Sequence, residues 1–256
     1  MTDQPVDLRR AMRSPRVKLL IWRIGCGVVL MLALRAVLDL DWTSVAPSWL
    51  FLLTGLGRSW LLAIVAITAG GLAAAPLALA RVYGPPGIRQ AATALIECVR
   101  ATPELMIVFW VYFTLPIVTG NQVTSWNAAL GSLSVIAAVY LAEVFRAGLY
   151  SVPRGQSEAS AATGMSGFST FLYVILPQAV RNMVPALIAQ LVGLFKTTSL
   201  VYAIGVMEFF RSITVTNNAV FAPYQLYLVL ALGYFLSCFA ITRIVRWYDP
   251  KYQLLE

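Results

Sequence analysis

Six long runs of mostly apolar residues constrain this chain more than any other feature of its sequence. They cover approximately residues 19–38, 57–80, 91–116, 128–150, 184–206 and 224–244. Each is close to the ~20 residues that a helix needs to cross a hydrocarbon core of ~30 Å. The runs are continuous, whereas strands of a membrane barrel alternate between apolar and polar positions over about ten residues. The sequence therefore predicts an all-α membrane protein with about six transmembrane helices.

The low content of charged residues also favours a membrane environment. Charged residues make up 12% of the chain, about half the share of ~25% found in soluble domains. The sequence contains no histidine, which removes the commonest general base and transition-metal ligand. The three cysteines stand singly in apolar runs and make neither a disulfide framework nor a metal-binding pattern. We expect no catalytic residue, no cofactor and no metal bound by this chain; a membrane enzyme that acts on lipid stays an alternative, but it would have to work without imidazole.

Basic residues predict the orientation of the helices. With the N-terminus in the cytoplasm, most of them fall on the cytoplasmic side, as the positive-inside rule requires. That side receives Arg9, Arg10, Arg13, Arg16, Lys18, Arg23, Arg81, Arg89, Arg146, Arg154, Arg181, Arg243, Arg246 and Lys251. The external side receives Arg35, Arg58 and Arg211. Both termini and residues 153–182 are therefore predicted to be cytoplasmic, and contact with anionic headgroups explains the net charge of +8.

The first run is predicted to be a retained membrane anchor. A signal peptide could have a similar length, but Arg23 and Arg35 interrupt this run and no A-x-A cleavage pattern follows it. Trp42 and Trp49 predict an external interfacial connector, because tryptophan is enriched at the membrane surface. The resulting division is a basic cytoplasmic tail at residues 1–18, then an extra N-terminal transmembrane helix with its connector at residues 19–50.

The segment between the fourth and fifth runs, residues 153–182, is polar and rich in small residues. Pro153 and Gly155 are expected to end the fourth run, because proline removes a backbone donor and glycine relaxes the chain. Residues 156–163 are rich in alanine and serine and are predicted to form a short helix. Gly164 suits the left-handed residue that closes such a helix.

A second short helix is predicted after this turn. Ser166 can cap its N-terminus, and its apolar positions continue from Gly167 to Leu176 before Pro177 breaks it. The segment is therefore predicted to form two short helices joined by a sharp corner. Taken alone, this pattern would also fit an ordinary amphipathic connector between two membrane helices.

The order of residues in the segment resembles the EAA loop of permease subunits from ATP-driven importers of the ABC class. That loop has a Glu-Ala-Ala triplet, then a glycine, then a Leu-Pro pair. Here Glu158-Ala159-Ser160 precedes Gly164 and Leu176-Pro177. The agreement extends over the whole constellation in register, which distinguishes it from a chance triplet.

Further patches resemble the polar amino acid importers in particular. Downstream of the loop stands Lys196-Thr197-Thr198-Ser199-Leu200, and upstream stand Arg100-Ala101-Thr102-Pro103 and Ala142-Glu143-Val144-Phe145-Arg146-Ala147-Gly148. The chain departs from the family at three places: Ser160 replaces the second alanine of the triplet, and Ala101 and Ala147 stand where glycine is usual. All three replacements remain small.

The resemblance implies a five-helix core of the type I importer permeases, preceded by the extra N-terminal helix. The core would occupy residues 51–256, with residues 153–182 as its cytoplasmic coupling loop, in a multi-pass protein of the bacterial inner membrane. In such proteins this loop meets an ATPase and drives the helices between outward-facing and inward-facing arrangements. The coupling residues that the resemblance implies are Arg154, Gly155, Glu158, Ala159, Ser160, Gly164 and Met165.

ATP hydrolysis is expected on other chains. Lys196-Thr197 could suggest a phosphate-binding P-loop, but Phe195 and Gln190 stand where that motif requires glycines. The resemblance implies a second permease subunit, identical or related, and two ATP-binding subunits that hold ATP and Mg²⁺. It also implies an extracytoplasmic solute-binding protein and a polar amino acid, or a similar solute, as substrate. No nucleic acid is expected.

Polar residues inside the runs are candidates for a solute pathway, because charge within a bilayer usually faces a cavity or a partner. Each of two acidic residues stands three positions before an arginine on one helix face, so these pairs could equally neutralise themselves. The candidates are Glu97, Arg100, Glu143, Lys196, Thr197, Thr198 and Ser199. A secondary transporter driven by an ion gradient would use similar charges and is the alternative function.

Overall fold

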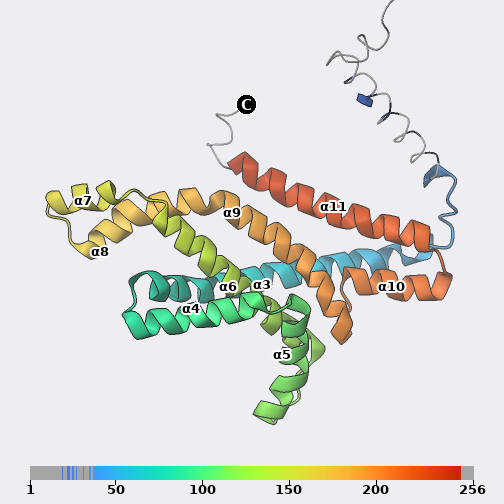
Figure 1. The fold of residues 1–256 in the computed structure, drawn as a ribbon. Helices are drawn as coiled ribbons and strands as arrows, with labels where there is room; N and C mark the ends of the chain where they lie inside the picture. The colour runs from blue at the N-terminus through green and yellow to red at the C-terminus, as the bar shows by residue number, and fades with distance from the viewer. Residues whose placement is uncertain are drawn as a thin grey trace, which may run out of the picture.

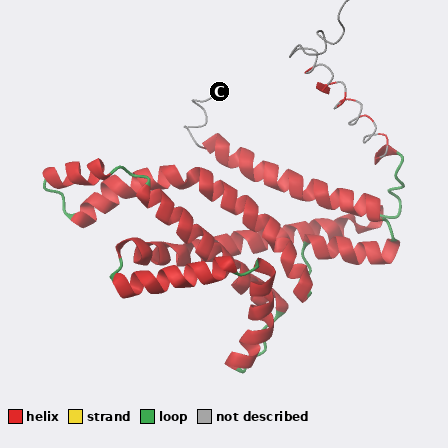
Figure 2. Ribbon diagram, in the orientation of Figure 1, coloured by secondary structure: helices red, strands yellow, loops and turns green. Residues whose placement is uncertain are grey.

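The computed structural model describes residues 37–248 and the isolated positions 19, 22, 23, 25, 27, 31 and 35; for residues 245–248 it describes the backbone alone. Every regular element in this part of the chain is a helix (Figure 1, Figure 2), which confirms the predicted all-α class. The elements are η1 (Ala46–Ser48), α3 (Trp49–Tyr83), α4 (Pro86–Ala101), α5 (Glu104–Thr119), α6 (Ser125–Tyr150), α7 (Arg154–Ala162), α8 (Gly167–Thr170), the π-helix η2 (Phe171–Ile175), α9 (Leu176–Thr197), η3 (Thr198–Ile204), α10 (Phe209–Val220) and α11 (Pro223–Tyr248).

The predicted tail at residues 1–18 lies outside the described residues, as do residues 249–256. Most of the predicted anchor at residues 19–38 lies outside them too, so the extra helix stays a prediction. The chain can be followed continuously from residue 37 through η1 into α3. There the rings of Trp42 and Trp49 stack with centroids 6.5 Å apart, within the predicted interfacial connector.

Four helical segments are long and apolar enough to cross a membrane, as the sequence predicts for four of its runs. They are Ala46–Tyr83, Ser125–Tyr150, Gly167–Ile204 and Pro223–Ile244. A fifth span is possible if α4 and α5 are taken together. Each segment begins before its predicted run, by 11 residues for Ala46–Tyr83 and by 17 residues for Gly167–Ile204.

The continuous helix expected over residues 91–116 is wrong. The chain breaks after Ala101 and restarts at Glu104, with α4 and α5 bent by 103° (Figure 1). Pro103 is the cause. Its ring disfavours the helical conformation in the preceding residue, and Thr102 accordingly has an extended backbone with ψ 134°.

The break expected at Pro177 is also wrong. Helix continues from η2 into α9, so Gly167–Ile204 is one helical segment. The π-helix accommodates the proline: the Leu176 N–H bonds to the Phe171 carbonyl, five residues back. The Gln178 side chain donates to the Val174 carbonyl at 2.8 Å. A wider turn thus relieves the clash that a proline ring makes with the preceding turn of an α-helix.

Small residues allow α3 and α6 to pack closely at the centre of the bundle. Ala66 and Ala74 of α3 and Ala137 of α6 are buried there. A Cβ added to Gly70 would lie 2.5 Å from the Cβ of Ala137, so the helices approach as closely as their backbones permit. Such contacts between small residues are the usual means by which helices associate in a membrane.

The bundle has two distinct ends (Figure 1). At one, which we call the loop end, lie α7, α8 and the turn between α3 and α4. The opposite end carries η1, the start of α11 and α10, a helix that the sequence did not predict. Glu208 caps α10 by accepting hydrogen bonds from the Phe210 and Arg211 N–H groups, and Ser59 of α3 donates to the same carboxylate at 3.2 Å. The fully buried Glu208 therefore fastens α10 to α3.

Candidate functional site

The loop between α6 and α9 has the predicted tight corner between two helices, α7 and α8, but α8 continues through η2 into α9. Gly164 has a φ of 81° in the left-handed region, and the Ser166 hydroxyl accepts from the Ser169 N–H at 3.2 Å to cap α8. Gly155 differs from expectation. It lies in the first turn of α7, because α6 already ends at Tyr150 and Pro153 is the residue that precedes α7.

Most of the predicted coupling residues lie on the surface of this loop. Five of them are exposed and Met165 is partly exposed; the exposed ones are Arg154, Gly155, Glu158, Ala159 and Gly164. Ser160 is buried instead, with its hydroxyl donating to the Gln156 carbonyl at 2.7 Å. The serine that replaces the family's alanine therefore packs inward, and its hydroxyl is satisfied by the backbone of its own helix.

Side chains fasten the loop to the helices on both sides. The Gln178 amide of α9 donates to the Gln156 side chain of α7 at 3.4 Å. The Asn182 amide of α9 donates to the Ser151 hydroxyl at 2.8 Å. Because α8 continues through η2 into α9 without a break, a continuous helix joins the loop to the centre of the bundle.

A cluster of charges lies on α3, α4 and α6, centred on Glu143. The Arg146 guanidinium lies 3.0 Å from the Glu143 carboxylate, Arg100 lies 3.7 Å from it, and Arg81 pairs with it as well. Arg81 also contacts Glu97 at 3.2 Å. The local pair of Glu143 and Arg146 thus forms, whereas Glu97 pairs with Arg81 rather than with Arg100.

A partly open pocket of about 170 Å³ lies between α3, α5, α6 and α9. Its polar lining comes from Glu104 of α5, Tyr140 of α6, and Gln190 and Thr197 of α9, and the rest is mostly aliphatic. The Thr197 hydroxyl donates to the Glu104 carboxylate at 2.9 Å. The pocket therefore combines a carboxylate, an amide and hydroxyls within apolar walls, as sites for small polar ligands do.

Only one of the four polar residues that interrupt the fifth run, Lys196 to Ser199, lines this pocket. Thr197 does so, while Thr198 is buried with its hydroxyl donating to the Phe195 carbonyl at 2.7 Å. The Ser199 hydroxyl donates to the Lys196 carbonyl at 2.8 Å, and Lys196 itself is exposed. Successive residues of a helix point about 100° apart, so Lys196 and Thr198 face other directions than Thr197.

The other predicted pathway residues lie outside the lining of this pocket. Arg100 contacts a residue of the lining, because its guanidinium lies over the Tyr140 ring, 5.6 Å from the centroid. Sequence reasoning missed Glu104 and Gln190 as pocket residues. Glu104 had a usable signal, since an acidic residue directly after the Thr102-Pro103 break of an apolar run implies a polar surrounding.

Comparison with known proteins identifies the family. The family model described as "Binding-protein-dependent transport system inner membrane component" matches residues 66–254. The chain belongs to this family. It is therefore an inner-membrane component of a binding-protein-dependent transport system and a multi-pass membrane protein, as the sequence resemblance implied.

Individual relatives of this binding-protein-dependent family agree with the assignment. The chain is 31% identical to the glutamate/aspartate import permease protein GltK of Escherichia coli O6:H1, over 82% of this chain and 96% of that protein. It is 30% identical to the glutamine transport system permease protein GlnP of Escherichia coli K12, over 85% of this chain and all of that protein.

Solved structures of transporters have the same fold. A chain from the crystal structure of an amino acid ABC transporter with histidines matches with a TM-score of 0.78 and 26% identity, covering 83% of this chain and 99% of that one. A chain of the inward-facing MetNI methionine ABC transporter matches with a TM-score of 0.65 and 21% identity, covering 78% of this chain and 97% of that one. The latter likeness concerns the fold alone.

Proposed function

We propose that this chain is the membrane-spanning permease subunit of an ATP-driven importer that moves a polar amino acid, or a close analogue, across the bacterial inner membrane. One observation carries the proposal. The helical segment Gly167–Ile204 joins the exposed loop at one end of the bundle to the pocket residue Thr197. The named relatives, which import glutamate, aspartate or glutamine, support an amino acid as solute.

The pocket has the chemistry to hold an amino acid. The Glu104 carboxylate suits the solute's ammonium group, and the Gln190 amide and the hydroxyls of Thr197 and Tyr140 suit its carboxylate or its polar side chain. The volume of about 170 Å³ is below the ~300 Å³ at which pockets for drug-sized ligands begin, so a small solute fits best.

The loop is the proposed contact with the ATP-binding subunits. Basic residues gather at the loop end, including Arg81, Arg89 and Arg154, which supports a cytoplasmic location by the positive-inside rule. ATP and Mg²⁺ would be held by two partner subunits. The core would extend over residues 51–256, with residues 153–182 as the coupling loop.

A second permease subunit, identical or related, would complete the membrane part, and a solute-binding protein would deliver solute from outside. The position of helix α5 favours the presence of a second subunit. This helix leaves the bundle (Figure 1), and its apolar side chains are not covered by the rest of the chain that the structure describes. Trp110 is 62% exposed and Ile117 is 81% exposed. The membrane or a partner helix must cover them.

The proposed mechanism follows from the continuous helix that joins the loop to the pocket. Closure of the ATP-binding subunits moves α7 and α8, and α9 moves with them. Gln190 and Thr197 then shift relative to Glu104, which lies on the separate helix α5. The hydrogen bond between Thr197 and Glu104 breaks, and the pocket opens to one side of the membrane.

Reversing the charge of Glu158 is expected to uncouple the importer. In proteoliposomes with the ATP-binding subunits and the binding protein, Glu158→Lys should lower ATP-dependent uptake and ATPase copurification about tenfold or more, as loss of an interfacial charge pair does. Asp41→Lys is the matched control, because Asp41 is an exposed carboxylate near the opposite end and should leave copurification intact. If uptake instead continued after ATP depletion and stopped when an ion gradient was collapsed, the chain would be a secondary transporter.

Removing the pocket carboxylate is expected to weaken solute recognition. Glu104→Gln should raise the solute KM for uptake about tenfold or more, because hydrogen bonds to charged groups contribute about 1.5–3 kcal/mol. Thr197→Val should raise the KM a few-fold. Thr242→Val is the control, since the Thr242 hydroxyl makes the same i−4 bond to a helix carbonyl but lines no solute pocket. An unchanged KM in Glu104→Gln would place the solute elsewhere.

A further inference from the structure

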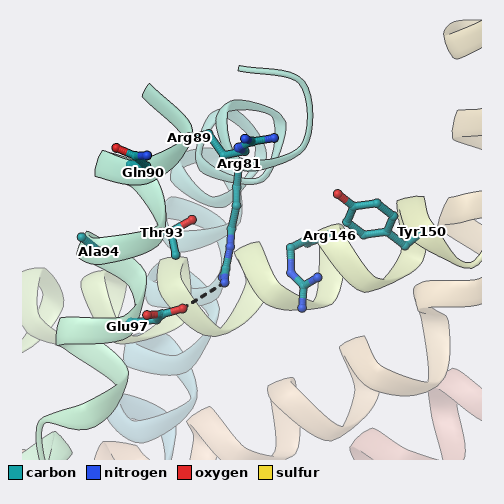
Figure 3. A pocket seen from close by; sticks show the side chains of 8 residues that line it. All are labelled: Arg81, Arg89, Gln90, Thr93, Ala94, Glu97, Arg146 and Tyr150. Atoms are coloured by element: carbon teal, nitrogen blue, oxygen red, sulfur yellow. Dashed lines mark hydrogen bonds and ion pairs between the residues drawn. The ribbon is translucent and has the colours of Figure 1, made fainter. Parts of the chain in front are cut away.

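A second pocket, of about 340 Å³, lies between α3, α4 and α6 towards the loop end, and it shares no lining residue with the solute pocket (Figure 3). Arg81 enters from α3, Arg89 and Thr93 from α4, and Arg146 and Tyr150 from α6. Residues of three separate helices thus line one opening.

Hydrogen-bond donors and positive charge predominate in this pocket. The lining holds three arginines and one carboxylate, Glu97, which pairs with Arg81; Glu143, outside the lining, pairs with Arg81 and Arg146. Arg89 makes no ion pair with any residue that the structure describes. In Figure 3 the Tyr150 hydroxyl points towards the side of the pocket that carries Arg89, while the Arg81 guanidinium is turned towards Glu97. The surplus of guanidinium, amide and hydroxyl donors suits an oxyanion.

Few side chains of helix α4 hold it against the rest of the bundle. It buries only Ala92 and Ile96, and its remaining side chains are exposed or partly exposed. An anion held by Arg89 on α4 and by Arg81 and Tyr150 on the neighbouring helices would bridge α4 to the bundle. At the predicted cytoplasmic surface, basic pockets between membrane helices meet the phosphates of anionic lipids.

We propose that this pocket binds a phosphate oxyanion and thereby pins α4 against α3 and α6. The phosphate can come from the headgroup of an anionic phospholipid or from free phosphate. Both present the same oxygens to the same donors, so the experiment separates them.

The test uses the purified full chain in neutral detergent without the ATP-binding subunits, so its outcome does not depend on the proposed transport function. Native mass spectrometry and thermal unfolding are recorded with phosphatidylglycerol, with phosphatidylcholine and with inorganic phosphate. We expect phosphatidylglycerol to be retained and to raise the melting temperature more than phosphatidylcholine does. Equal protection by inorganic phosphate alone would assign the site to free phosphate, and no protection by any of them would overturn the proposal.

Two variants identify the site. Arg89→Gln should reduce phosphatidylglycerol retention about tenfold, because one charge-assisted contact is lost. Folding should be unaffected, since this exposed side chain has no ion pair among the described residues. Arg243→Gln removes the same charge from an exposed arginine of α11, whose guanidinium lies over the Phe239 ring, and should retain the lipid. Equal loss in both variants would mean unspecific attraction and would refute the pocket.

Discussion

Replacing Gly70 with leucine is expected to leave no stably folded chain. The α3 backbone at Gly70 lies directly against α6, and an added Cβ would be 2.9 Å from both the Ala138 nitrogen and the Ser134 carbonyl oxygen. These are backbone atoms and cannot rotate away, so the two helices must separate. Even Gly70→Ala should cost about 1–3 kcal/mol, the usual range for overpacking.

The adjacent glycine is the control for this experiment. A Cβ added to Gly71 would meet only the Leu141 side chain, at 3.8 Å, so Gly71→Leu should give folded protein. Size-exclusion chromatography and thermal unfolding in detergent distinguish the two. If Gly70→Leu and Gly71→Leu gave the same monodisperse yield and melting temperature, the close packing of α3 on α6 would be wrong.

Removing the Glu143 carboxylate should be the most damaging change within the charge cluster of α3, α4 and α6. Arg81, Arg100 and Arg146 all face it, and its side chain is only 18% exposed. Glu143→Ala therefore leaves three positive charges without their shared partner. We expect a loss of about 3 kcal/mol, at the lower end of the range for breaking a buried pair because some exposure remains.

Two further variants test the cause of that loss. Glu97→Gln removes a carboxylate with 63% exposure and a single partner, so its effect on stability should stay below about 1 kcal/mol. Adding Arg146→Gln to Glu143→Ala should restore part of the melting temperature, because one of the repelling charges is gone. A melting temperature in Glu143→Ala equal to that of Glu97→Gln would show that the cluster contributes little.

Local patterns in the sequence predicted the parts of the fold that depend on neighbouring residues. The apolar runs determine the long helices, and the Gly164 and Ser166 positions determine the corner of the loop, because turn and cap chemistry acts over a few residues. The pair of Glu143 and Arg146 was predictable for the same reason. Such a pair requires only that its two residues stand three positions apart on one helix.

The prolines show what neighbouring residues in the sequence cannot predict, namely which proline interrupts a helix. Pro76, Pro116 and Pro185 all lie inside helices, whereas Pro103 separates two. Membrane helices tolerate proline where neighbouring groups satisfy the freed carbonyls, so composition alone cannot tell which proline breaks the chain.

The pocket lined by Glu104 and Thr197 could not be predicted from the sequence for a related reason. Glu104 and Thr197 are 93 positions apart and meet because the break at Pro103 places the first residue of α5 beside the last residue of α9. Arg81 likewise reaches Glu97 and Glu143 from another helix, which changed the partner expected for Glu97. Contacts between residues that lie far apart in the chain produce no periodic pattern in a single sequence.

The unbroken helix between the loop and the pocket fixes a rotational phase as well as a distance. Each residue inserted or deleted between Leu176 and Gln190 would turn the loop by about 100° relative to the pocket and move it by about 1.5 Å along the axis. Substitutions in this stretch can be absorbed by packing, but a change of length would aim α7 and α8 at a different side of the bundle. The number of residues there is therefore under tighter constraint than their identity, whereas the turn between α5 and α6 can vary in length without altering that register.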